Sequence, residues 1–355
     1  MDETLGSISF SEVLESLQET GKPFPVRYLR SFSDLSRKHL KDLLQIWENL
    51  PLDRKVNLLE DLEDIIESDT LVNFDNLSRV LISDPNPSIR VLALNLLWEC
   101  EDPGLIPELL NLSRDDQDED VRATSTSLLG KYVLLGELEA IKPEINAKVV
   151  GHLINILAGN DQARVKQRAL ESLGYSSHHS VPGLIQNAYL SPQTEWITCA
   201  LCAMGRSADE AWSAQVDKML TSPIPEIQFE AIRTAGELEL SNSRDKLLNL
   251  LEAGIDDEEI RLATIWSLSQ IGGDDIKDKL VELLETAADD EEAEWIEKAL
   301  ENLELTSPGS MGNIRYERES EDDPDVDDEE YIDDDEYYDF DNDDDDYDDE
   351  DEIED

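Results

Sequence analysis

Two short motifs in this chain contain residue types that carry out redox chemistry or bind metals. Cys199 and Cys202 have the Cys-x-x-Cys spacing of thiol redox motifs. His178 and His179 are adjacent, and histidine is the commonest metal-binding side chain. A redox pair needs its first cysteine at the start of a helix, where the helix dipole lowers the thiol pKa. A metal site needs two or three more ligands at matched spacing.

Neither motif lies in such a context. The helical pattern around the two cysteines begins near Thr194, so both fall inside a helix and we interpret them as small packing residues. The two histidines lie in a polar turn, 176–180, which we expect to be solvated. Phosphate-binding loops, nucleophile elbows and His-Glu-x-x-His motifs are absent from the sequence. We therefore predict a protein that is not an enzyme and has no catalytic, cofactor-binding or metal-binding residues.

The charge of the chain excludes further classes of partner. The formal net charge is -56, of which residues 315–355 carry -25, from 27 acidic and 2 basic residues. Such a polyanion repels phosphate backbones and anionic lipids, so we predict no nucleic acid and no membrane partner. The first residues carry no secretory signal pattern, and three cysteines fit a reducing compartment. We therefore predict a cytoplasmic location.

One segment shape recurs along most of the chain. It has an acidic turn, a β-branched or aromatic anchor, often a basic residue next, a small residue four after the anchor and usually Gly nine after it. Successive anchors are 31 to 44 residues apart, a period that predicts a solenoid of stacked helical units. We place the anchors at Ile89, Val121, Val165, Trp196, Ile227, Ile260 and Trp295.

The helices of these units are expected in pairs, about eight in all. The 44-residue step between Val121 and Val165 is too long for one unit, so we place an insertion at 138–159 with an extra or a lengthened helix. We divide the chain into an irregular N-terminal segment with one short helix, a solenoid, a linker and a disordered acidic tail. Their bounds are 1–36, 37–305, 306–314 and 315–355.

The repeated segment resembles a known family. The pattern Asp-x-x-(Val/Ile)-Arg-x-x-Ala-x-x-x-Leu-Gly is followed at 118–130, except for Ser125, and at 257–269, except for Thr264 and Ser269. It is similar to the short bacterial HEAT-like repeat, which also occurs in phycobilin lyase-type proteins. The resemblance covers about residues 37–303 and implies an all-α fold, an α-solenoid of HEAT-like helix pairs. Such repeats occur in many unrelated proteins, so the resemblance implies little about function.

Basic residues directly after the anchors are the candidate partner-binding residues. They are Arg90, Arg122, Lys166 and Arg261. The alternative, which we favour, is that they stabilise a ladder between repeats, with Asp118 and Asp257 capping helices and pairing with the arginines four residues later. The tryptophans at anchors, Trp196 and Trp295, are expected in the core, and core positions are also favoured for Trp98, Trp212 and Trp266.

Solenoids mostly bind partners along extended surfaces. The main hypothesis is a non-enzymatic interaction scaffold that binds a protein along the concave face of the solenoid, where the second helices of the pairs should lie. One alternative is a chaperone or antagonist of a basic protein, in which the acidic body and tail imitate the charge of nucleic acid. The tail also intersperses Tyr and Phe among acids, a composition of segments that bind basic partners, so basic proteins are the partners expected for it. The other is a lyase-type or chromophore-attachment protein, suggested by the resemblance alone.

Overall fold

All regular secondary structure is helical in the residues that the structure, a computed structural model, describes, namely 9–287 and 289–306. Within these ranges there is no strand, which confirms the predicted all-α class. The predicted linker beyond Thr306 and the predicted acidic tail, 315–355, lie outside the described residues. No described helix is long and apolar enough to cross a membrane.

The N-terminal segment is tied to the first helix pair. Helix α1 (Phe10–Gln18) begins at the predicted serine cap, where the Ser9 hydroxyl accepts a hydrogen bond from the Glu12 N–H. After the predicted break comes a 3-10 helix that the sequence did not indicate, η1 (Val26–Phe32). Arg54, a buried residue of the first helix pair, donates to the carbonyls of Leu17 and Lys22. It therefore holds the end of α1 and the loop that follows it together.

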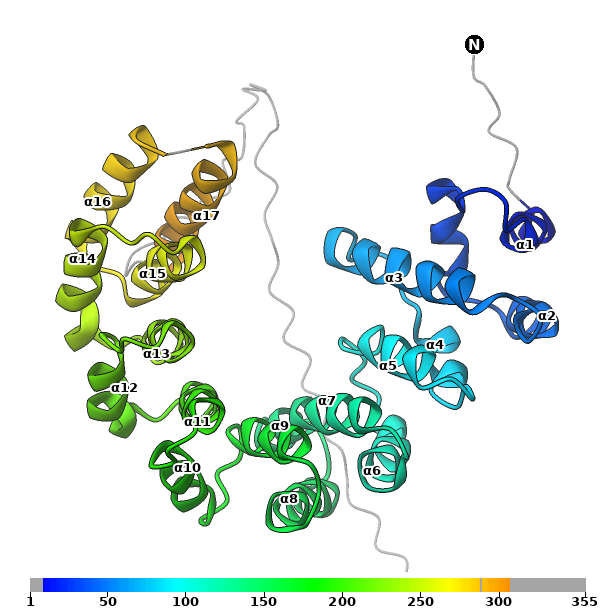
Figure 1. The fold of residues 1–355 in the computed structure, drawn as a ribbon, viewed down its shortest axis with the longest axis horizontal. Helices are drawn as coiled ribbons and strands as arrows, with labels where there is room; N and C mark the ends of the chain where they lie inside the picture. Colours follow the sequence, from blue (N-terminus) through cyan, green and yellow to red (C-terminus); the bar gives the residue numbers. More distant parts are fainter. Residues whose placement is uncertain (1–8, 288, 307–355) are drawn as a thin grey trace, which may run out of the picture. The chain divides into compact units, whose positions relative to one another are not determined.

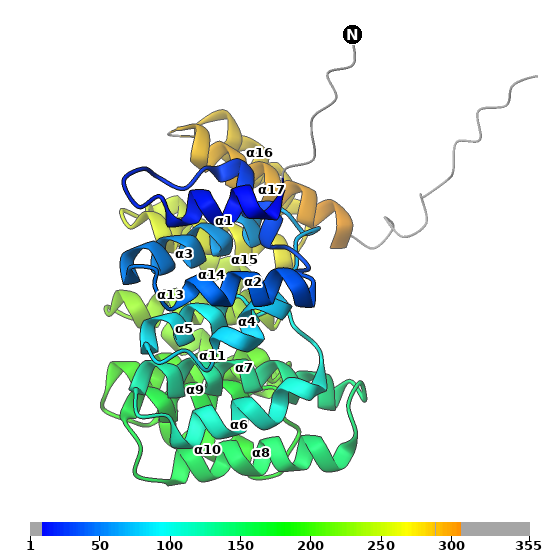
Figure 2. The same cartoon turned by 90° about the vertical axis from the view of Figure 1, so that its right-hand side faces the viewer.

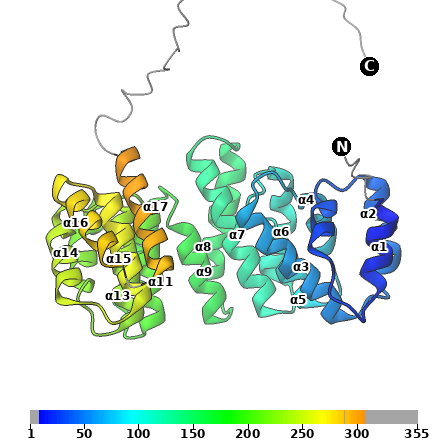
Figure 3. The ribbon, with the colours of Figure 1, turned by 90° about the horizontal axis from the view of Figure 1, so that it is seen from above.

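Beyond this segment, the helices form eight consecutive pairs, as predicted (Figure 1). From the second pair on, each second helix packs against its own first helix, and consecutive second helices from α3 to α17 pack against one another. Figures 2 and 3 show the same succession from two other directions. The first helices are α2 (Arg37–Trp47), α4 (Asp75–Leu81), α6 (Ile106–Asp115), α8 (Pro143–Ala158), α10 (Val181–Tyr189), α12 (Ser213–Met219), α14 (Arg244–Ala253) and α16 (Asp274–Glu285). The second helices are α3 (Leu52–Ser68), α5 (Pro87–Asn95), α7 (Glu119–Glu137), α9 (Ala163–Leu173), α11 (Thr194–Arg206), α13 (Pro225–Glu237), α15 (Glu258–Ile271) and α17 (Asp290–Thr306).

Short 3-10 turns lead into three of the first helices. They are η2 (Pro103–Leu105), η3 (Glu210–Trp212) and η4 (Ser241–Ser243), which precede α6, α12 and α14. Asp102 and Asp209 cap the first two turns by accepting backbone N–H bonds.

The 44-residue spacing between the anchors Val121 and Val165 comes from lengthened helices rather than from an extra helix. Helix α7 has 19 residues and α8 has 16, and the two are joined directly by the 138–142 loop. Of the two predicted alternatives, the lengthened helix is therefore the correct one. Both α7 and α8 are longer, and the pair α8 and α9 still packs between its neighbours in the stack.

The small residues of the repeat lie where second helices approach one another closely. A Cβ added at Gly174 would stand 2.7 Å from the carbonyl oxygen of Ala203 on the next second helix, and one at Gly236 would stand 2.8 Å from the Ser267 Cα. Contacts this short leave no room for a side chain. The small residues four after the anchors, such as Ala169 and Ala231, are fully buried.

Hydroxyl groups add a second link between neighbouring second helices. Ser172 donates to the Thr126 carbonyl at 3.0 Å, and Thr234 donates to the Leu201 carbonyl at 3.0 Å. Each donor lies seven residues after its anchor and each acceptor five after the anchor of the preceding repeat. These bonds satisfy buried hydroxyls without using the helix's own backbone. They recur at Ser267, which donates to the Ile232 carbonyl.

The anchor predicted in the last second helix was wrong. Trp295 is 39% exposed, whereas the next residue, Ile296, is fully buried. The buried stripe of α17 continues through Ala299 and Leu303, so the position equivalent to Ile260 is Glu292, 32 residues later. Trp295 lies one residue off this stripe, which explains its exposure.

Candidate functional site

The two cysteines are packing residues, as the sequence indicated. Cys199 is buried and its thiol donates to the Gln167 carbonyl at 3.2 Å. Burial raises the pKa of Cys199 well above its ordinary value and raises that of Cys202 to about 12. Both thiols are therefore protonated near neutral pH, and neither is a nucleophile.

One of the two histidines, His178, lines a cleft, but no metal-binding group of side chains surrounds it in the part of the chain that the structure describes. The cleft, of about 850 Å³, lies between the end of α7, α8 and the turn after α9, and His178 and Glu137 contribute to it. His178 Nδ1 hydrogen-bonds the Ser180 hydroxyl at 2.8 Å. Nowhere in the described ranges do three His, Cys, Asp or Glu side chains gather as they would around a metal ion. The cleft lies where α7 and α8 are lengthened, and the spacing of its lining side chains did not predict it.

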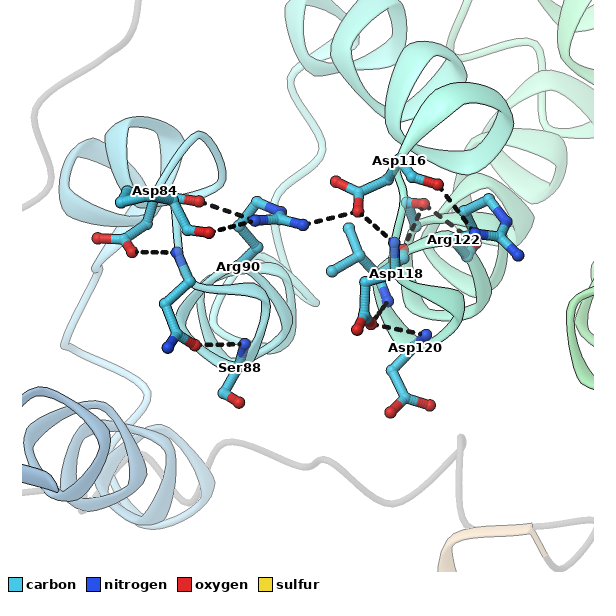
Figure 4. A network of polar contacts seen from close by, with 11 residues as sticks. Asp84, Ser88, Arg90, Asp116, Asp118, Asp120 and Arg122 are labelled. Atoms are coloured by element: carbon cyan, nitrogen blue, oxygen red, sulfur yellow. Dashed lines mark hydrogen bonds and ion pairs between the residues drawn. The ribbon is translucent and has the colours of Figure 1, made fainter. Parts of the chain in front are cut away.

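The basic residues after the anchors form a ladder between repeats (Figure 4). Arg90 donates to the Asp84 carbonyl in the turn before its own helix and bonds the Asp116 carboxylate of the next turn at 2.6 Å. Arg122 repeats the arrangement, with the Asp116 carbonyl behind it and the Asp161 carboxylate ahead at 2.9 Å. Each arginine thus links two consecutive repeats through one planar group.

Elsewhere in the stack the same position makes one half of this arrangement, either the bond to the preceding turn or the bond to the next repeat. Lys166 donates to the Gly159 carbonyl, and Gln228 donates to the Leu220 carbonyl. Arg261 reaches forward to Glu292 of α17 at 2.5 Å. All four predicted partner-binding residues therefore have bonds within the chain, and whether any of them also contacts a partner is a separate prediction.

The pairing predicted within each repeat was wrong in one respect. Asp118 and Asp257 do cap α7 and α15, because their carboxylates accept backbone N–H bonds from Val121 and Ile260. The arginines four residues later do not pair with these caps; Arg122, for example, bonds Asp161. The carboxylate of Asp118 accepts backbone N–H bonds at the start of its own helix, and the Arg122 guanidinium instead reaches Asp161, which also accepts the Gln162 N–H.

The electrostatics of the ladder favour its charged form. Burial alone would raise the pKa of Asp161, but hydrogen bonds from Arg122 and the Gln162 N–H, with the charges of Arg122 and Lys166, lower it below its ordinary value. The pKa of Arg122 is raised by its hydrogen bond to Asp161. The ion pair therefore stays charged across the physiological range.

A surface strip runs across the second helices. It consists of the residues one before and three, six and ten after each anchor, which lie on one side of a helix because these offsets follow its period. Contacts between neighbouring helices place the strip: Asp120 pairs with Arg164, and Arg206 lies 5.1 Å above the Tyr175 ring. In α9, α11 and α13 the strip comprises Arg164, Arg168, Glu171, Tyr175, Glu195, Cys199, Cys202, Arg206, Glu226, Glu230, Arg233 and Glu237. In α15 and α17 it comprises Glu259, Ala263, Trp266, Gln270, Glu291, Trp295, Lys298 and Asn302.

The middle of the strip is a mixed-charge cluster that the sequence did not reveal. Arg168 bonds buried Glu171 at 2.6 Å, and Arg233 bonds Glu230 at 3.3 Å and Glu237 at 2.9 Å. Burial raises the pKa of Glu171 and of Glu230 despite the nearby arginines. The offsets from the anchors could have located these residues, but a charge on a helix normally indicates a solvated face.

Tryptophans form the end of the strip. Trp266 and Trp295, from α15 and α17, meet edge to face with ring centroids 6.4 Å apart. Trp98, also expected in the core, is 55% exposed, and Trp196 is only partly buried, whereas Trp212 is buried as predicted. Exposed tryptophans near arginines and acids are the side chains that most often dominate binding energies.

The stacked pairs and their ladder define an α-solenoid built from helical repeats. The family model for HEAT repeats matches residues 74–174 and 213–301, more than half of the chain. The chain therefore belongs to the HEAT-repeat family, as its repeat pattern indicated. Among curated proteins, none matches this chain.

Solved structures with similar folds come from several organisms. The complex of CpcE and CpcF of phycocyanin lyase from Nostoc sp. PCC7120 has 18% identity and a TM-score of 0.43, covering 64% of this chain and 94% of that one. YibA from E. coli has 17% identity and a TM-score of 0.41, covering 79% and 95%. Human deoxyhypusine hydroxylase in complex with glycerol has 15% identity and a TM-score of 0.32, covering 74% and 95%.

Proposed function

We propose that this protein is a non-enzymatic interaction scaffold that binds a protein partner along the face formed by its second helices. The observation that carries the proposal is the strip, in which seven consecutive second helices, α5 to α17, pack side by side in an unbroken series. An extended row of side chains of this kind suits a long, shallow binding surface rather than a reaction in one pocket. The concave position of this face stays part of the proposal.

The side chains of the strip support this function. Trp295 is exposed beside Trp266, and the arginines of the central cluster are held in place by carboxylates. Ordered arginines and tryptophans lose little conformational freedom on binding, which favours affinity. A further cleft of about 330 Å³ opens on the strip between α5, α7 and α9, beside Thr124 and Arg168.

Affinity capture from native cells with matched variants tests the proposal. The strip variant carries Thr124→Ala, Glu195→Ala and Trp295→Ala, and the control carries Asn111→Ala, Asn249→Ala and Val281→Ala on the first helices. We expect a protein captured by the wild type to be lost with the strip variant and kept with the control. Loss with the control alone would contradict the proposal.

A third bait, truncated after Thr306, separates the chaperone or antagonist alternative. That alternative is favoured by the acidic composition of residues 315–355, which carry a net charge of -25. It predicts partners that are basic, that are lost on truncation and that dissociate as salt is raised. The lyase-type alternative has no corresponding observation in the strip.

A further inference from the structure

Four successive second helices have a glutamate immediately before the anchor. All four are exposed, and no ion pair within the described part of the chain involves any of them. We call these residues the acidic row: Glu195, Glu226, Glu259 and Glu291.

The row is continuous from helix to helix. Helices α11, α13, α15 and α17 pack against one another in that order. The equivalent positions of α7 and α9 hold Asp120 and Arg164, which form an ion pair. Side chains at this position of neighbouring helices therefore come within bonding reach, so a cation between two members of the row can contact carboxylates from both helices.

An aromatic surface that attracts cations adjoins the row. Trp295 lies four residues after Glu291, on the same face of α17 one turn away. The ammonium of Lys298 lies 5.4 Å from the centroid of its ring, which is the geometry of a cation–π interaction. Lys298 also pairs with Glu294, so a lysine or arginine of a partner would share or replace this contact on the exposed indole.

The charge of this part of the chain has the same sign as the row. Residues 225–305 contain 23 acidic and 7 basic residues, a net of -16. A glutamate in a first turn also stabilises its own helix through the dipole, independently of any partner. Binding and stability must therefore be measured separately.

The spacing of the row determines the form of the partner. Packed helices lie about 8–10 Å apart. An extended chain in the polyproline II conformation rises about 3.1 Å per residue with three residues per turn, so every third side chain points the same way after about one helix spacing. We propose that the acidic row binds an extended basic segment of a protein partner, with lysine or arginine at about every third residue. This inference rests on the proposed function and specifies the chemistry of its partner.

Peptide binding to the full chain tests the proposal. The probe is a fluorescent peptide of repeated Lys-Ser-Thr units with a photo-crosslinker, and its isomer has the same composition with the lysines consecutive. The row variant carries Glu226→Gln, Glu259→Gln and Glu291→Gln. The control loses the same charge from exposed positions on first helices, with Asp245→Asn, Glu252→Gln and Asp278→Asn.

We expect the spaced peptide to bind more tightly than its isomer and to crosslink to α11, α13, α15 or α17. The row variant should weaken binding about tenfold and the control less than about twofold, because each exposed ion pair contributes only modestly. Melting temperatures of both variants show whether the helices themselves are affected.

Three results would overturn the inference: equal weakening in both variants, equal affinity for the two peptides, or crosslinks confined to residues 315–355. Each points to attraction by overall charge rather than to the row. If the peptide fails while the captured partner still depends on the strip, this inference is wrong and the proposed function remains. If the captured partner is indifferent to the strip, the proposed function itself fails.

Discussion

Single glycines determine how closely the second helices approach. At Gly174 a methyl group would meet the backbone of Ala203, whereas at Gly205 it would meet only the flexible carboxylate of Glu237. We expect Gly174→Ala to lower the free energy of unfolding by roughly 1–3 kcal/mol through overpacking. Gly205→Ala is the matched control, because Glu237 can rotate away and alanine favours the helix by about 1 kcal/mol.

Urea denaturation of the two variants checks this prediction. The ordering matters more than either value, since both changes add one methyl group to equivalent positions of neighbouring repeats. Equal losses of stability would contradict the close approach of α9 to Ala203.

Glu171 provides a pH-dependent prediction. Burial raises its pKa in the folded chain above the unfolded value of about 4.3. Between those two values the folded state binds protons more readily, so the wild type gains stability as the pH falls through this window. We expect Glu171→Gln to be more stable than the wild type above the folded pKa and this advantage to shrink toward pH 4.3.

Denaturation midpoints of the two proteins at several values between pH 8 and pH 5, about the range in which a raised carboxyl pKa acts, measure the effect. A variant that is less stable than the wild type at pH 8 would mean that the bond to Arg168 outweighs the cost of burial. Arg168 is the side chain most affected by the change, and it is partly exposed, so water can solvate it.

Residues of the core were easier to predict than those of the site. Val165 and Ala169 follow the apolar period, and Asp118 precedes a helix as caps do, so local pattern was sufficient. Trp295 and Ile296 are adjacent, and both are large apolar residues that could occupy a buried position of the repeat. The choice depends on α15, where Arg261 reaches Glu292, and a contact 31 residues away is not encoded in local spacing.

At the scale of the helix pair, the ladder predicts stability rather than affinity. Arg122→Gln and Arg261→Gln together remove the bonds to Asp161 and Glu292. We expect unfolding to become easier by about 2 kcal/mol for each site, the range for hydrogen bonds to charged groups. Partner affinity should be unchanged at temperatures where the chain is folded.

Calorimetry and binding of the captured partner check both parts of this prediction. Unchanged stability with affinity about tenfold lower would favour direct contact between these arginines and the partner. Ser88→Ala, in the first turn of α5, is a control for substitution beside the ladder, because its hydroxyl makes no bond to the guanidiniums drawn in Figure 4.

The pairing of helices was predictable because turns and apolar stripes are local signals. The acids that pair with the ladder arginines were not predictable, since Arg122 has one acid four residues before it and another 39 residues after it. Only the stacking of α7 on α9 decides between them. The strip was not predicted for the same reason: its residues come from different repeats, and only the stacking of the second helices brings them together.

At the scale of the whole chain, we expect the predicted tail to be dispensable for folding. Residues 315–355 have few apolar side chains and strong self-repulsion, so their composition cannot offset the entropy of ordering. Truncation after Thr306 should leave the melting temperature within a few degrees, a shift that corresponds to about 1 kcal/mol or less. Differential scanning calorimetry of both forms measures this, and a lost cooperative transition would contradict it.

Two residues of the repeat reflect contacts with the following repeat rather than the needs of their own helix. They are the glycine nine residues after the anchor and the basic residue directly after the anchor. Helix α17 has neither, because Ala293 and the exposed Glu301 occupy those positions. A duplicated helix pair inserted earlier in the array would have these contacts with the repeats before and after it. A further pair stacked on α17 would meet the Glu301 side chain and no basic residue after the anchor, so the close glycine contact and the forward ion pair that join α7 to α9 are absent at this helix.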